Sequence, residues 1–64
     1  MADWYTVYNI AGGVDYRGNS LQKAIELTRI TYNEYIPKID EQKNKRLICI
    51  IKNNLAYYLA ERQQ

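Results

Sequence analysis

The chain has 64 residues, one cysteine and no histidine, and this combination limits what it can fold into. A domain of this size buries only about 60% of the surface of its unfolded chain, and its core supplies roughly 3–5 kcal/mol of net stability. Small domains usually add disulfides, a structural metal or self-association. Cys49 has no second cysteine to pair with, and zinc prefers cysteine and histidine ligands. The sequence therefore predicts a single domain over residues 1–64, without metal or cofactor, that depends on a packed core or on association.

The first third of the chain has the composition of two strands. Residues 4–10, Trp-Tyr-Thr-Val-Tyr-Asn-Ile, are mostly aromatic or β-branched, which favours a strand. Residues 11–13, Ala-Gly-Gly, favour a turn, and residues 14–17 alternate apolar and charged side chains. We therefore expect a β-hairpin over about residues 4–17.

The register of this hairpin can be predicted from the segregation of its side chains. A three-residue loop, with Tyr8 opposite Tyr16 and Gly13 in the left-handed conformation, separates apolar from polar residues best. The face expected to pack on the helices then holds Trp4, Thr6, Tyr8, Ile10, Val14 and Tyr16. The face expected to meet solvent holds Tyr5, Val7, Asn9, Asp15 and Arg17.

Apolar residues at helical spacing fill the rest of the chain. Asn19 and Ser20 are both good N-caps, and Gln22 stands three residues after Asn19 as in a capping box. The pattern that follows predicts a first helix over about 20–35. A second helix is expected over about 38–62, with a break near Asn44 as the alternative. Its predicted apolar stripe is Leu47, Ile48, Ile51, Leu55, Tyr58 and Leu59. The fold class expected is α+β, a small ββαα domain with the hairpin packed on a two-helix hairpin.

An all-α fold is the alternative architecture. Residues 54–62, Asn-Leu-Ala-Tyr-Tyr-Leu-Ala-Glu-Arg, resemble the first helix of a tetratricopeptide repeat, and residues 20–27 resemble a second helix. This resemblance covers less than a third of the chain and implies three helices, with residues 4–17 helical. Stacking of such repeats needs about three of them, which this chain is too short to hold.

The sequence offers no recognisable catalytic group. Histidine, the commonest general base, is absent, and neither phosphate-loop nor dinucleotide-binding glycine spacing occurs. Asp40 and Glu41 are neighbours, so on a helix their carboxylates diverge by about 100°. Cys49 lies within Leu-Ile-Cys-Ile-Ile and is expected to be a small buried hydrophobe. We therefore expect a non-enzymatic protein.

The open edges of a two-stranded sheet suggest a surface for protein binding. Neither strand carries the proline or lysine run that often blocks an edge, so a partner strand or a second copy can add there. We expect a protein-binding module (an adaptor, a regulator or an inhibitor of a larger protein), with self-association as a homodimer as one alternative. The residues expected to contact the protein partner, whose identity the sequence does not give, are Tyr5, Val7, Asn9 and Arg17.

A second alternative is nucleic-acid binding, although a net charge of +2 gives it little support. The residues that would contact phosphates are Lys43, Lys45, Arg46 and Lys52. Their spacing scatters them around a helix, as on an ordinary solvated face.

The setting expected for the chain is the cytoplasm. No run approaches the ~18–20 apolar residues of a membrane span, and the N-terminus has no signal-peptide pattern. A lone cysteine fits a reducing compartment. The bias towards Tyr, Asn and Ile would suit an accessory protein of a phage or mobile element.

Overall fold

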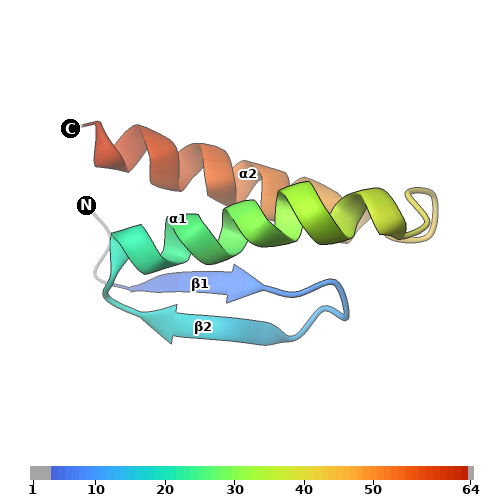
Figure 1. Ribbon diagram of the computed structural model, residues 1–64, viewed down its shortest axis with the longest axis horizontal. Coiled ribbons are helices and arrows are strands. Elements are labelled where there is room, and N and C mark those ends of the chain that lie inside the picture. The colour runs from blue at the N-terminus through green and yellow to red at the C-terminus, as the bar shows by residue number, and fades with distance from the viewer. Residues whose placement is uncertain (1–3, 64) are drawn as a thin grey trace.

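The computed structural model describes residues 4–63 and contains a hairpin followed by two helices. Strands β1 (Tyr5–Tyr8) and β2 (Val14–Gly18) pair antiparallel. Figure 1 shows helices α1 (Leu21–Ile30) and α2 (Lys45–Arg62) side by side along β1, with β2 on the far side of β1. The predicted ββαα fold is confirmed. The three-helix alternative is wrong, because the aromatic and β-branched residues of the first segment form strands.

The core forms where β1 meets the two helices. Tyr5 and Val7 of β1 are 4% and 1% exposed, and they surround the fully buried Ala24 of α1. The small alanine lets the helix approach the strand closely, so the two elements pack without a gap. Partly buried side chains from β2 and both helices complete this cluster: Tyr16, Leu21, Leu27 and Tyr58.

The register differs from the one predicted, because the loop is longer. Tyr8 lies opposite Val14 and Val7 lies opposite Tyr16, so Asp15 is the extra residue of a β-bulge. The side chain of Asn9 sets this arrangement, since its Oδ1 accepts hydrogen bonds from the N–H groups of residues 11 and 13 at 2.9 and 3.0 Å. The strand therefore ends at Tyr8, and the two faces of β1 are exchanged relative to the prediction.

The glycine that turns the chain is also not the one predicted. Gly12 has a φ of +85°, whereas the sequence pattern assigned the left-handed conformation to Gly13. The N–H of Gly12 donates to the carbonyl oxygen of Asn9 at 3.0 Å, and the N–H of Asn9 donates to that of Gly13 at 2.9 Å. These bonds join residues 9 and 13 across residues 10–12, one residue earlier in the chain than the loop predicted over residues 11–13.

The first helical segment runs past the predicted end near residue 35 and has three conformations. Of the two predicted caps, Asn19 and Ser20, it is Ser20 that caps α1, its hydroxyl accepting from the N–H of Lys23 at 3.2 Å. The chain then continues through a π-helical turn, η1 (Thr31–Tyr35), and a 3₁₀ turn, η2 (Ile36–Lys38). The widening at Thr31 accompanies a bond from its own hydroxyl to the carbonyl oxygen of Leu27 at 3.1 Å.

The second helix begins at Lys45 and not at 38, which matches the alternative of a break near Asn44. Asp40 holds a separate turn in front of it, because its carboxylate accepts from the N–H groups of Gln42 and Lys43 at 2.9 and 3.3 Å. The Asn44 side chain donates back to the Asp40 carbonyl oxygen at 2.9 Å and makes no cap bond to α2. The polar stretch that precedes the helix is therefore a turn and not a frayed extension of it.

Candidate functional site

Three of the four residues predicted to contact a protein partner are unsuited to it. Tyr5 and Val7 lie in the core, because the bulge and the longer loop turn their face of β1 towards the helices. Asn9 uses its side chain inside the loop, where its amide also donates to the carboxylate of Asp15 at 3.1 Å. Of these four residues, Arg17 alone is exposed on the solvent side of the hairpin. The predicted solvent exposure of Tyr5 and Val7 was therefore wrong, and the side chain of Asn9 is occupied within the loop.

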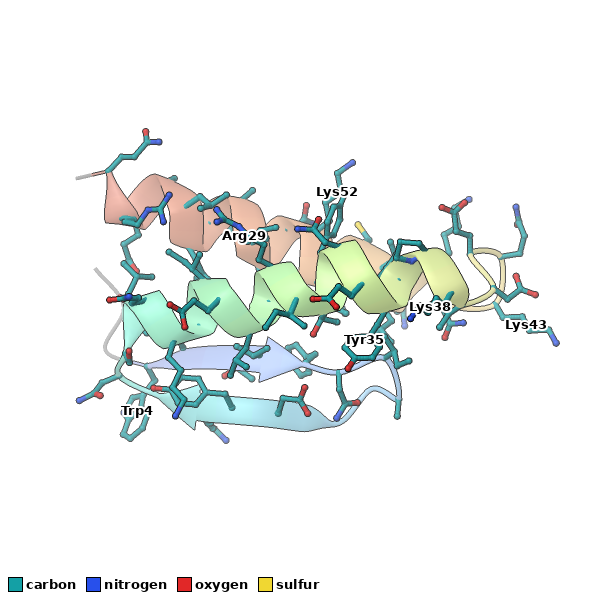
Figure 2. All side chains as sticks on the ribbon, viewed as in Figure 1. Trp4, Arg29, Tyr35, Lys38, Lys43 and Lys52 are labelled. Atoms are coloured by element: carbon teal, nitrogen blue, oxygen red, sulfur yellow. The ribbon has the colours of Figure 1, made fainter. Side chains whose placement is uncertain are left out.

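The surface that takes their place is the opposite side of the hairpin, called the outer face below. Trp4 is 64% exposed and Val14 is 52% exposed, although both were predicted to pack on the helices. Trp4 and Arg17 line an open hollow of about 330 Å³, and Figure 2 shows Trp4 pointing away from both helices. By strand alternation, the outer face consists of Trp4, Thr6, Tyr8, Val14 and Arg17.

The free edge of β1 is closed by a side chain from the other end of the chain. The Tyr58 hydroxyl donates to the carbonyl oxygen of Thr6 at 2.7 Å and accepts from the N–H of Thr6 at 3.2 Å. The Tyr58 ring meets the ring of Tyr5 edge to face, with centroids 5.4 Å apart and planes at 89°. One hydroxyl from α2 therefore satisfies both backbone groups of Thr6, at the position where another strand would otherwise pair.

The bonds at Thr6 also show which way the backbone of β2 faces. Residues in an antiparallel pair alternate between hydrogen-bonded and non-hydrogen-bonded partners. Since Thr6 turns both groups to Tyr58, its pair with Arg17 is of the second kind, and the N–H and C=O of Arg17 point away from β1. The same alternation turns the backbone groups of Val14, opposite Tyr8, away from β1.

The β2 edge has no covering element comparable to α2. The sheet has two strands, and within residues 4–63 no further strand pairs with β2. The bulge at Asp15 interrupts the regular spacing of the edge, which is one way in which proteins discourage strand addition. The edge therefore offers two backbone positions, Val14 and Arg17, separated by two residues.

The four basic residues of the nucleic-acid alternative do not gather into one patch. Lys43 lies in the turn before α2, Lys45 and Arg46 form the first turn of that helix, and Lys52 follows nearly two turns later. All four are exposed, and Figure 2 shows the side chains of Lys43 and Lys52 pointing in different directions. Lys45 and Arg46 are neighbours on the helix, so their side chains leave it about 100° apart.

The exposed side chains of α2 include Cys49, which the sequence pattern assigned to the core. Cys49 is exposed, contrary to the expected burial, and the Asn53 amide donates to its Sγ at 3.6 Å. The core position of this segment is Ile51, which is 1% exposed. Ile50 and Tyr57 are 40% and 76% exposed on the same helix. An apolar run of five residues covers every side of a helix, so its members cannot all face the core.

A second hollow lies where α1 approaches the end of α2. Its volume is about 380 Å³, and its lining mixes apolar, acidic and basic side chains: Leu21, Gln22, Ile25, Glu26, Arg29 and Arg62. The Gln22 amide donates to the carboxylate of Glu26 at 3.3 Å, so part of this lining is already paired.

Metal binding and membrane insertion find no support among residues 4–63. No group of three or more acidic, cysteine or histidine side chains is placed to hold a metal ion within that range. None of the described helices has the length and apolar character needed to cross a bilayer.

Comparisons with known proteins identify no relative, since no family model, no curated protein and no solved structure matches the chain.

Proposed function

We propose that this chain is a non-catalytic protein-binding module that engages its partner through the outer face and the adjoining edge of β2. The observation that carries the proposal is the exposure of Trp4 beside Arg17 on a sheet face that no helix covers. Tryptophan, tyrosine and arginine are the residues most enriched at the energetic centres of protein interfaces. An exposed tryptophan in so small a domain has no role in the core, which Tyr5 and Val7 fill.

The asymmetry of the hairpin supports the same surface. The helices cover the inner face of β1, and Tyr58 closes its edge, so binding groups are left on the opposite face and on β2. Such a module would act by occupying a surface of a larger protein as an adaptor, regulator or inhibitor. The proposal includes a cytoplasmic setting, because the exposed Cys49 would otherwise be free to cross-link copies by oxidation.

The test is a pull-down with matched aromatic variants. Tagged wild-type chain, Trp4→Ala and Tyr57→Ala are incubated with nuclease-treated lysate of the source cell, and bound proteins are quantified by mass spectrometry. Trp4 and Tyr57 are both highly exposed, but they lie on the hairpin and on α2, respectively. A centre-of-interface residue contributes about 2 kcal/mol or more, so Trp4→Ala should reduce partner recovery roughly 30-fold while Tyr57→Ala retains it.

The opposite pattern would contradict the proposal. If Tyr57→Ala loses the partner and Trp4→Ala retains it, the binding surface is α2 and not the hairpin. If untreated lysate yields nucleic acid, and Lys45→Glu with Arg46→Glu abolishes its recovery, the chain is a nucleic-acid-binding protein.

A further inference from the structure

We infer that the strand which pairs with β2 is the β2 strand of a second copy of this chain, giving a symmetric four-stranded sheet. This inference goes beyond the proposed function, because it assigns the β2 edge to a second copy, while a larger protein would contact Trp4 on the outer face. In the paired arrangement the strand order is β1, β2, then β2 and β1 of the other copy. The two-fold axis passes between Asp15 and Tyr16.

The backbone groups of β2 fit this symmetry. The outward-facing positions are Val14 and Arg17, as established by the bonds of Thr6 to Tyr58 and by the register of the hairpin. An antiparallel copy places Val14 opposite Arg17 of the other copy, and Arg17 opposite its Val14. Each is then a hydrogen-bonded pair, because both residues turn N–H and C=O towards the shared edge.

The bulge favours a copy over an ordinary strand. Two residues, Asp15 and Tyr16, separate the outward positions of β2, whereas one residue separates such positions in a regular strand. A regular partner would therefore place one residue against two. A second copy brings the same two residues in the opposite order, so the number of residues on the two strands is equal.

The side chains on the helix side are complementary in charge. Across the axis, Asp15 lies opposite Tyr16 of the other copy. Within each copy, the Lys23 Nζ stands 5.4 Å from the centroid of the Tyr16 ring, on the side where α1 packs. Asp15 lines a hollow with Thr31 and Tyr35, which places its carboxylate on that side as well. Each Asp15 therefore approaches Lys23 of the other copy, and the symmetry gives two such pairs.

The same pairing would also bury apolar surface on the outer face. Val14 and Arg17 both lie on it, so the alkyl stem of Arg17 covers the half-exposed Val14 of the other copy. A two-stranded sheet is marginal in water unless it packs on a helix or gains further strands, and here α1 packs on its inner face. Association would supply the additional strands that this short chain lacks.

Sedimentation equilibrium with charge-exchanged variants tests the inference. The wild-type chain should double in mass as its concentration rises from the micromolar to the millimolar range. Asp15→Lys places lysine opposite Lys23, and Lys23→Glu places glutamate opposite Asp15, so each variant alone should dimerise at least about tenfold more weakly. An equimolar mixture restores both opposite-charge pairs and should form a heterodimer with about wild-type affinity.

A second variant, which removes a backbone N–H, keeps the inference testable if Asp15→Lys does not fold. Far-UV circular dichroism would show whether Asp15→Lys is folded. Arg17→Pro removes an N–H that points away from β1, so the hairpin keeps its bonds while the dimer loses two. Arg17→Pro should therefore be folded and monomeric. Arg17→Ala retains the N–H and should still dimerise.

Several results would overturn the inference. These are a wild-type chain that stays monomeric at millimolar concentration, a mixture of charge variants that stays monomeric, and an Arg17→Pro variant that dimerises normally. If the wild type is monomeric but a lysate partner still depends on Trp4, the proposed function stands and this inference falls. If the charge-exchanged mixture dimerises but no lysate partner depends on Trp4, the inference stands, and the proposed binding of a larger protein falls.

Discussion

The two edges of the hairpin are built differently, although each belongs to a strand of four or five residues. The β1 edge is closed by Tyr58, a residue 52 positions away in sequence, whose hydroxyl bonds both backbone groups of Thr6. The β2 edge has no such cover and carries a bulge at Asp15. The comparison shows that a single side chain can stand in for a third strand on one edge. Within residues 4–63, the other edge has no such closure from a helix side chain or a further strand.

The largest expected effect follows from removing the closure of β1. Tyr58→Ala deletes the hydroxyl and the ring that packs on Tyr5, and should lower the free energy of unfolding by about 3 kcal/mol. Because the whole domain is expected to have roughly 3–5 kcal/mol, much of the variant should be unfolded. Tyr58→Phe removes the hydroxyl alone and should cost about 1–2 kcal/mol. Urea denaturation followed by circular dichroism measures both values.

The control for this prediction is the neighbouring exposed ring. Tyr57→Ala should change stability by no more than about 0.5 kcal/mol, because its side chain is 76% exposed. If Tyr57→Ala and Tyr58→Ala lowered the free energy of unfolding equally, the contacts of Tyr58 with β1 would contribute nothing to stability.

A matched pair of valines compares the inner and outer faces directly. Val7→Thr places a hydroxyl in the core, where it should cost about 1–3 kcal/mol. Val14→Thr places the same hydroxyl at a half-exposed position on the outer face and should change stability by less than about 0.5 kcal/mol. The face assignment would be contradicted if Val14→Thr were the more damaging substitution in a dilute, monomeric sample.

The next largest effect on stability is expected in the loop that sets the register of the hairpin. Asn9→Ala removes the acceptor for two loop N–H groups and the donor to Asp15, at a cost of about 1 kcal/mol for this exposed site. Asn19→Ala is the control, since Asn19 is exposed just after β2. Thermal unfolding in dilute solution would give the midpoint temperatures of Asn9→Ala and Asn19→Ala. Identical midpoints would show that the hydrogen bonds of the Asn9 side chain do not hold the loop.

The smallest effect concerns the basic start of α2. Lys45 lies at the positive end of the helix dipole, and no acidic residue occupies the first turn. Lys45→Glu should therefore stabilise the chain by about 0.3–1 kcal/mol at low salt, and added salt should reduce the gain. The same variant should leave the binding properties of the hairpin unchanged. A loss of protein-partner binding in Lys45→Glu would move the candidate site from the hairpin to α2.

The order and type of the elements could be predicted from local pattern. The strand-forming residues of β1, a turn at residues 11–13 and a helix start at Asn19 or Ser20 are each encoded over a few residues, and the structure has a strand, a loop and a helix start there. The left-handed glycine within the loop was assigned wrongly. The division of the second helical region at Asn44 was anticipated only as an alternative, because the turn depends on a bond from the Asp40 carboxylate that no periodicity reveals.

The faces of the hairpin were not predictable from the same information. Segregation of apolar side chains favoured a register that puts Trp4 inside, but the Asn9 side chain holds a longer loop and the bulge shifts the pairing by one residue. A one-residue shift exchanges the two faces of a strand, so the predicted contact residues Tyr5 and Val7 became core. The signal that could have warned of this was Asn9 itself, whose side chain commonly bonds backbone groups that follow it in sequence.

The most direct test of the difference between the two edges is amide hydrogen exchange, measured by NMR for Thr6 and Arg17. Thr6 donates its N–H to Tyr58 at 3.2 Å, whereas the N–H of its opposite residue Arg17 faces away from β1. In a sample dilute enough to be monomeric, we expect strong protection of the Thr6 amide and rapid exchange of the Arg17 amide. Equal protection of the two amides at that dilution, or faster exchange at Thr6 than at Arg17, would contradict the account.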